Sequence, residues 1–471
     1  MSHAAPDASA EPVATDARPD RHARADLVRR EPDRLPLPIR LNRWTIWLVF
    51  LAAHVIAYWV STFHYSKPFT DVTGVYRMWM DQAHAGNIPG IDQPFVYPVG
   101  ALVPMWLTDF VGGHDSYGAA WFALVVLLDC WAMTRLTERP VDVDAPLRRS
   151  AAWFWALFLL CLGVIGIGRI DAITVPLAIV GLLELRHHPR LAGMLFTAGA
   201  WVKVWPAALF AAALVSMRRW RPLLIGAAWI CGAVLAAVLA IGGPRALTNA
   251  ITFVTEQTGR GLQLESLTSS LFLLGDLLGI EGYKVAYSQE ILTQQITGPG
   301  VETAIDLLTP LMFVAMAGLL ALGWFARRRG MGLARRLPAL ALGIVCAFFV
   351  FNKVGSPQFM TWLAPVIIIG LIWDGRAFRR VAIVGLAIAL LTNLIYPWYY
   401  YEIVRADLNG VLALLVRNLF VVWLLCWSID RLRSGIRPRR RAEAATDADE
   451  DAATDADEAA TAEPGAAGER A

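Results

Sequence analysis

The sequence predicts an all-α, polytopic membrane protein with about twelve transmembrane spans, because of its composition and the length of its apolar runs. Of the 471 residues, 56% are hydrophobic and only 17% are charged, whereas soluble domains average about 25% charged residues. The apolar residues gather in runs, and about 20 residues of helix cross the ~30 Å hydrocarbon core of a bilayer. A bundle of membrane-spanning helices is the fold class that these observations favour.

Arginine-rich loops separate the apolar runs and predict their orientation. Arg148 and Arg149 precede one run, and Arg327, Arg328 and Arg329 follow another. Such loops remain on the cytoplasmic side. Placing all of them inside gives an even number of spans and puts both termini in the cytoplasm, as in a multi-pass plasma-membrane protein. The expected spans are 44–62, 116–134, 150–167, 171–186, 191–202, 203–217, 222–241, 303–325, 337–351, 359–373, 381–397 and 411–429.

Two apolar stretches do not fit single spans. Residues 99–112 are short and contain Pro104 and Asp109, which predicts an interfacial or re-entrant helix. Residues 191–217 are too long for one span and hold Lys203 in the sequence WVKVWP. We expect two short helices there, with Lys203 at the turn near the outer side, where protein or a watery cavity satisfies the freed backbone groups.

The two ends of the chain lack apolar periodicity. Residues 1–43 are rich in Ala, Pro, Asp and Arg, and residues 431–471 begin basic and become acidic with an ATDADE repeat. Both predict disordered cytoplasmic arms around a transmembrane domain at 44–430. The five cysteines lie singly in apolar runs, so we expect neither a disulfide nor a metal site. No nucleotide-binding loop or zinc-ligand spacing is present, and we expect no cofactor, no metal and no nucleic-acid partner.

With this topology, the unusual polar residues of the membrane domain gather on one outer face. Acids and bases close to hydrocarbon are costly and mark functional sites. The structural alternative is that some of them are snorkelling anchors or structural ion pairs, and an ion pair between Arg169 and Asp171 is the obvious candidate. The set comprises Asp71, Arg169, Asp171, Lys203, Arg260, Gln263, Glu265, Lys353, Gln358 and, inside the last span, Arg417.

Four segments, in this order along the chain, resemble a known enzyme family. They are FTDVTGVYRMWM…FVYPVGALVP, GRIDAITVPLAIVGLLELRHHPRLAGMLFTAGAWVKVWPAALF, RGLQLESLTSSL and NKVGSPQFMTWLAP. Over about residues 44–430 the chain is similar to the GT-C glycosyltransferases that use polyprenyl-phosphate sugars, in particular family 87, the relatives of alpha-mannosyltransferases and arabinofuranosyltransferases. The chain has Tyr97-Pro98-Val99 where these families often show Tyr-Pro-Pro.

The resemblance implies a GT-C fold and an enzyme that moves a sugar from a polyprenyl-phosphate donor to a hydroxyl of an envelope glycolipid or glycan on the outer face. The family's general base is an Asp soon after the first span, and Asp71 matches it by position. Asp81 and Asp92 are the fallback candidates. The alternative for Asp71 is a helix N-cap, since a helical pattern follows it. His64 either assists Asp71 or lies at the membrane interface.

Other residues are then expected to bind the phosphate and the sugar of the donor. A departing phosphate needs cations, which Arg and Lys supply without a metal. For this role we expect Lys203, Arg260, Lys353 and Arg417. For sugar hydroxyls we expect Gln263, Glu265 and Ser266, and for an interfacial aromatic belt residues 398–401.

The resemblance leaves the donor sugar open between mannose, which we expect, and arabinofuranose. A transporter or flippase for lipid-linked sugars also accounts for intramembrane charges and broken helices. Against it, the halves show no inverted repeat, and the polar residues gather on one face. An envelope scaffold would not need Lys203 or Arg417 at membrane depth.

Overall fold

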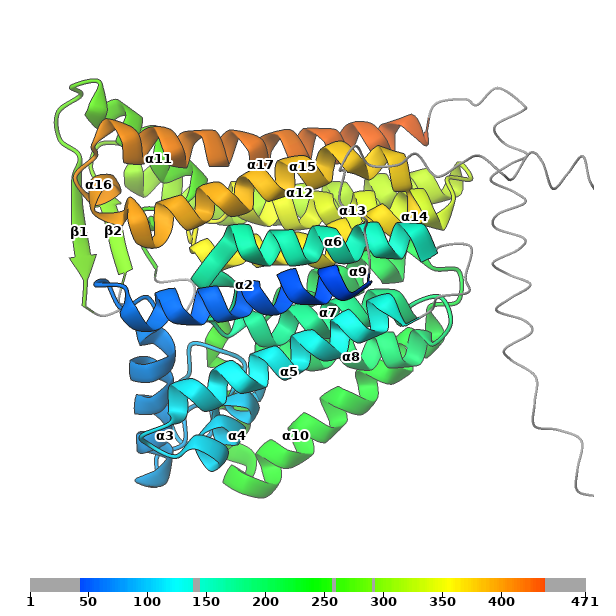
Figure 1. Cartoon of the computed structure of the whole chain (residues 1–471), viewed down its shortest axis with the longest axis horizontal. Coiled ribbons are helices and arrows are strands. Elements are labelled where there is room, and N and C mark those ends of the chain that lie inside the picture. Colours follow the sequence, from blue (N-terminus) through cyan, green and yellow to red (C-terminus); the bar gives the residue numbers. More distant parts are fainter. Residues whose placement is uncertain (1–42, 139–144, 256–259, 290–292, 437–471) are drawn as a thin grey trace, which may run out of the picture. The chain divides into compact units, whose positions relative to one another are not determined.

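The computed structural model describes residues 43–138, 145–255, 260–289 and 293–436. Within these ranges the regular secondary structure is helical apart from one antiparallel hairpin, β1 (Lys284–Ser288) and β2 (Thr293–Thr297), as Figure 1 shows. The predicted arm at 1–43 and tail at 431–471 lie largely outside the described residues.

Eight helices in the described residues are long and apolar enough to cross a membrane. The prediction of an all-α membrane protein is therefore confirmed. The eight are α2 (Arg43–Phe63), α5 (Tyr117–Thr137), α6 (Ala145–Leu162), α10 (Arg221–Ala250), α12 (Val301–Arg328), α13 (Leu333–Phe351), α15 (Phe378–Asn393) and α17 (Leu408–Ser434).

The expected number of about twelve spans is not confirmed. The remaining expected spans form shorter apolar helices, and whether these cross the membrane stays a prediction. They are α7 (Asp171–Glu184), α8 (Pro189–Val202), α9 (Pro206–Ser216) and α14 (Leu363–Trp373).

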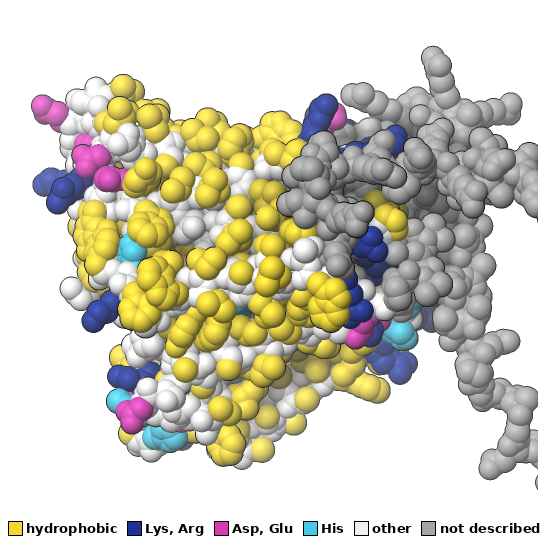
Figure 2. Space-filling model, viewed as in Figure 1, with side chains coloured by type: hydrophobic (Ala, Val, Ile, Leu, Met, Phe, Trp, Pro, Cys, Tyr) yellow, Lys and Arg dark blue, Asp and Glu magenta, His cyan; other side chains and the backbone are white. Residues whose placement is uncertain are grey.

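The helices differ in how much of their surface the protein covers. Helix α14 is buried along almost its whole length, whereas α10 and α12 bury only a few residues each. An apolar helix with little protein around it fits contact with lipid. Figure 2 shows hydrophobic side chains across the middle of one face, with charged side chains near its two ends. This distribution is that of a membrane-embedded surface.

The break between α8 and α9 lies where the sequence predicts it. Helix α8 ends before Lys203, which has an extended backbone, and α9 begins at Pro206. Proline suits the first turn of a helix because it has no N–H to leave unpaired. The prediction of two short helices with Lys203 at the turn is confirmed.

A second short element precedes α5. Residues Val99–Ala101 form one 3₁₀ turn, and α4 (Leu102–Gly112) follows it. Helix α4 is apolar and too short to be counted among the eight candidate spans. Phe110 and Val111 are exposed on it, so its length and surface suit the interfacial position that we expect, which stays a prediction.

One buried polar contact joins two of the long helices. Nε2 of His54 in α2 lies 3.0 Å from Oδ2 of Asp129 in α5, and Nδ1 of His54 lies 2.8 Å from the Phe50 carbonyl oxygen. Both side chains are buried. Because ionisable groups at this depth are costly without partners, the pair fixes α2 against α5.

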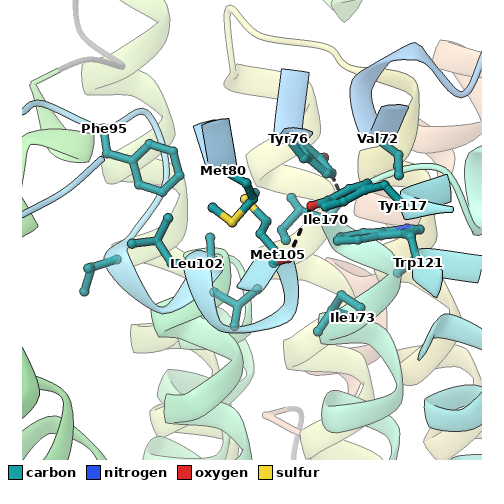
Figure 3. Packing of buried hydrophobic residues seen from close by; sticks show 14 of the residues in the cluster. Val72, Tyr76, Met80, Phe95, Leu102, Met105, Tyr117, Trp121, Ile170 and Ile173 are labelled. Atoms are coloured by element: carbon teal, nitrogen blue, oxygen red, sulfur yellow. Dashed lines mark hydrogen bonds between the residues drawn. The ribbon is translucent and has the colours of Figure 1, made fainter. Parts of the chain in front are cut away.

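The segment after α2 contributes to a hydrophobic core at its own end of the bundle. It contains a π-helical turn, η1 (Asp71–Tyr76), then α3 (Arg77–His84), a loop and α4. Val72, Tyr76 and Met80 pack with residues of α4, α5 and α7, as Figure 3 shows. The Ile170 N–H donates to the Tyr76 hydroxyl oxygen at 2.9 Å. This packing fixes η1 against the turn that leads into α7.

Candidate active site

Asp71 opens the η1 turn, and its carboxylate is half-exposed. Its side chain keeps 40% of its surface accessible, and Oδ2 lies 3.0 Å from Nε of Arg169. The cap position before this turn is Thr70, which makes no side-chain capping bond. The alternative interpretation of Asp71 as a helix N-cap is therefore wrong. The carboxylate binds a guanidinium group and remains accessible to a substrate.

Arg169 is buried, and the protein uses most of its donors. Nη1 donates to the carbonyl oxygens of Pro68 (3.0 Å) and Gly168 (2.7 Å), and Nη2 donates to the hydroxyl of Tyr396 at 3.3 Å. Burial alone would lower the pKa of Arg169, but Asp71 and Tyr396 outweigh it and raise this pKa. Arg169 is held in place and in turn holds Asp71.

The suggested Arg169–Asp171 ion pair is wrong, because Arg169 pairs with Asp71. Oδ1 of Asp171 accepts a hydrogen bond from Nε1 of Trp362 at 2.6 Å. Oδ2 of Asp171 has no hydrogen-bond partner among the described residues. As the first residue of α7, Asp171 points into the protein and is fully buried, so it is better placed to orient neighbours than to contact a substrate.

Lys203 lies next to this group. Its Nζ is 4.4 Å from the centre of the Tyr97 ring and 5.8 Å from that of Phe359. It is half-buried and lies within electrostatic range of Asp171. Trp362 stacks on Trp205 at 5.3 Å between ring centres. The aromatic contacts orient the lysine.

Tyr76 lies at the centre of these residues. It is fully buried, and burial raises its pKa well above the ordinary value, with Tyr97, Asp71 and Asp171 adding to the rise. The charges of Asp71, Arg169 and Asp171 all act on the Tyr76 hydroxyl group, which groups these residues around one site.

A second group of predicted residues surrounds α11 (Leu267–Leu277). Residues 262–264 run beside the hairpin, because Leu264 N–H donates to Gln294 and Ile296 N–H donates to Leu262. Ser266 caps α11 by accepting the Ser269 N–H at 3.1 Å. This arrangement brings Gln263 and Glu265 to the inner side of the hairpin, where both are buried.

The loop after α13 closes over this group. Gln263 N–H donates to the Lys353 carbonyl at 3.0 Å, and the Ser356 hydroxyl donates to Oε1 of Gln263 at 3.1 Å. Gly355 is required here, because an added Cβ would lie 2.2 Å from Cα of Ser266. Burial lowers the pKa of Lys353, although Asp306 opposes the shift.

Arg417 lies inside α17 and is almost fully buried, with 1% of its surface exposed. Nη2 donates to the Glu265 carbonyl at 2.6 Å, and Nε donates to Oδ1 of Asn418 at 3.0 Å. Nη1 has no hydrogen-bond partner among the described residues. Arg417 and Glu265 line a small cavity of about 10 Å³, the size of one water molecule or one hydroxyl group.

Two contacts join the group of residues around Arg169 to the group around Glu265. Tyr396, which binds Arg169, packs against Tyr400 at 5.4 Å between ring centres, and Tyr400 hydrogen-bonds to the Glu265 carboxyl group. Phe359 contacts Lys203 on one side and lines the Arg417 cavity on the other. The structure therefore brings the predicted residues from Asp71 to Arg417 into one continuous region.

Comparison with known proteins identifies the family. The model of glycosyltransferase family 87 matches residues 95–357, more than half of the chain. The chain belongs to glycosyltransferase family 87. No curated protein and no solved structure matches the chain.

Membership in family 87 makes the protein a membrane glycosyltransferase, and the enzyme prediction is confirmed over the transporter and the scaffold. The matched range includes Arg169, Lys203 and Glu265 but not Asp71 or Arg417. The roles of all the site residues stay predictions.

Three predicted residues of this family 87 glycosyltransferase lie beside the site. Arg260 and Gln358 are half-buried in segments that adjoin the site. His64 contacts Ser66 at 2.8 Å and the ring of Trp398, which favours the interfacial interpretation over assistance to Asp71.

Sequence reasoning missed the neutral groups of the site. Tyr396, Trp362 and Asn418 hydrogen-bond to predicted ions of the site. Tyr76 accepts a hydrogen bond from the backbone N–H of Ile170, next to Arg169. Asn418 carried a usable signal, because an amide beside an arginine within a span is unusual. The two tyrosines and Trp362 lie among many aromatic residues, and only the fold separates them from lipid anchors.

Proposed function

We propose that this family 87 glycosyltransferase transfers mannose from a polyprenyl-phosphate donor to a hydroxyl of an envelope glycolipid or glycan, at the outer face of the plasma membrane. One observation carries the proposal. Asp71 offers a half-exposed carboxylate that a buried guanidinium holds at 3.0 Å.

Asp71 acts as the general base in this proposal. Its carboxylate removes the proton of the acceptor hydroxyl as the acceptor oxygen attacks the anomeric carbon of the donor sugar. The bond between that carbon and the phosphate oxygen breaks, and its electron pair stays with the phosphate. Arg169 keeps the carboxylate oriented, and its own donors are too engaged with the protein to bind a phosphate.

Lys203 is the cation best suited to the departing phosphate. Negative charge develops on the leaving phosphate oxygen, and a cation that already lies in place stabilises it. Lys203 is half-buried and its position is fixed by contacts with the rings of Tyr97 and Phe359, which suits it to this role. The leaving group is a monophosphate, which Lys and Arg can hold without a metal.

The test is a transfer assay with purified full-length protein in lipid vesicles. Polyprenyl-phosphate mannose and an envelope glycolipid extract should give a mannosylated product by mass spectrometry. Polyprenyl-phosphate arabinofuranose serves as the competing donor, and product from it alone would replace mannose in the proposal. No product from any polyprenyl-phosphate sugar would overturn the donor class.

A further inference from the structure

Two buried polar atoms of opposite kind belong to residues that line the cavity beside α17. They are Oε2 of Glu265 and Nη1 of Arg417, and neither has a hydrogen-bond partner among the described residues. Their residues expose only 3% and 1% of their surface. An unsatisfied buried group costs about 1–3 kcal/mol, and more when it is charged. Two such groups on one cavity therefore point to a bound partner.

The chemistry of the two atoms restricts the kind of group that can bind to both of them. A carboxylate oxygen only accepts hydrogen bonds, whereas a guanidinium N–H only donates them. The charge of Glu265 would repel a phosphate or carboxylate ligand, and the charge of Arg417 would repel an ammonium group. A neutral hydroxyl satisfies both, because it donates to Glu265 and accepts from Arg417.

Both side chains are already held in place for such a group. Asn418 and the Glu265 carbonyl fix the guanidinium of Arg417, and Gln263 and Tyr400 hydrogen-bond to the Glu265 carboxyl group. A ligand that binds to oriented partners loses little free energy in ordering them.

The position of the cavity connects it with the donor. Phe359 forms part of its wall, and the same ring lies 5.8 Å from Nζ of Lys203, the proposed phosphate contact. The sugar on that phosphate must lie close by. We propose that Glu265 and Arg417 bind one hydroxyl of the donor sugar and so contribute to the choice of sugar. This inference rests on the proposed function.

Deoxy analogues of the donor test the proposal. Polyprenyl-phosphate mannose and its 2-, 3-, 4- and 6-deoxy forms are bound to the full-length protein in vesicles, and direct binding is measured without turnover. For one deoxy position, wild-type affinity should fall by about 10- to 100-fold, as expected for a lost hydrogen bond to a charged group. In the Glu265→Gln and Arg417→Met variants, removal of the same hydroxyl group should no longer lower the affinity for the donor.

Glu302→Gln is the matched control, because Glu302 is an exposed glutamate at the start of α12, and it should retain the wild-type preference. The proposal is overturned if every deoxy form binds wild type as well as the parent does, since the cavity then holds only water. The proposal is also overturned if the deoxy form loses as much affinity for Glu265→Gln as it does for wild type. The wild-type series remains decisive if a variant does not fold. Transfer is measured separately, so its absence refutes the proposed function without deciding the binding result.

Discussion

Nε of Arg169 lies 3.0 Å from Oδ2 of Asp71, although the two residues come from segments far apart in the sequence. Arg169 also binds the carbonyl oxygen of Pro68, three residues before Asp71, and the hydroxyl of Tyr396 near the other end of the chain. The guanidinium group therefore links the segment after α2 to the turn before α7 and to the segment after α15.

Replacing Asp71 by Asn should reduce transfer by at least about 100-fold, because an amide cannot accept the acceptor proton and general bases contribute about 10²–10⁴ to rate. The variant should bind the donor with nearly unchanged affinity. Asp81→Asn is the control, since Asp81 is an exposed residue on α3. Full activity of Asp71→Asn would remove Asp71 from the mechanism and return attention to Asp81 and Asp92.

Replacing Arg169 by Lys should lower kcat more than it raises KM. A lysine cannot contact Asp71, two carbonyl oxygens and Tyr396 together, so the base loses its orientation while the donor site remains. We expect kcat to fall by about 10- to 100-fold. Tyr396→Phe removes only one of these contacts and should have a smaller effect. A rise in KM with unchanged kcat would instead show that Arg169 binds substrate.

The sequence was sufficient for the features that depend on local chemistry. Pro206 and Lys203 predict the break between α8 and α9, because proline begins a helix and a lysine avoids hydrocarbon. Asp71 was selected from three acids through family resemblance, and the structure places it at an accessible helical turn.

Features that depend on long-range packing were beyond the sequence. Asp171, two residues away, was the obvious partner of Arg169, but it turns inward to Trp362 as α7 begins. The partner is Asp71, which only the packing of η1 against the Ile170 turn brings close. The number of spans stays a prediction for a related reason, since hydropathy does not distinguish a short buried helix such as α14 from a transmembrane span.

Replacing Lys203 by Met should lower both donor affinity and kcat, because the cation contacts the phosphate before the reaction and more strongly as charge develops on it. We expect kcat/KM to fall by at least about 100-fold. Lys203→Arg should recover part of the activity, since a cation remains near Tyr97. If Lys203→Met bound and used the donor as wild type does, the phosphate contact would have to be Arg260, Lys353 or Arg417.

Replacing Gly355 by Ala should destabilise the protein and displace the loop that covers Glu265. The new Cβ would lie 2.2 Å from Cα and 2.3 Å from N of Ser266, and backbone cannot move aside cheaply. We expect a loss of at least about 2 kcal/mol, seen as a lower Tm in detergent. Gly318→Ala in α12 is the control, because nothing lies within 4 Å of its added Cβ. Equal Tm values for the two variants would contradict the close contact.

The stability of the wild-type protein should depend on Glu265 as the pH changes. Burial raises the pKa of Glu265 above its ordinary value of 4.5, and the nearby Arg417 offsets this shift only in part. The folded state therefore holds the proton more tightly than the unfolded state. The contribution of this group to stability is largest below the ordinary pKa and is lost as pH rises through the raised pKa. The Glu265→Gln variant has no group that ionises at this position. The Tm of the variant minus the Tm of wild type should therefore increase from about pH 5 to about pH 8. Glu302→Gln provides the comparison at an exposed site. A difference that stays constant or decreases over this range would show that Glu265 does not have a raised pKa in the folded protein.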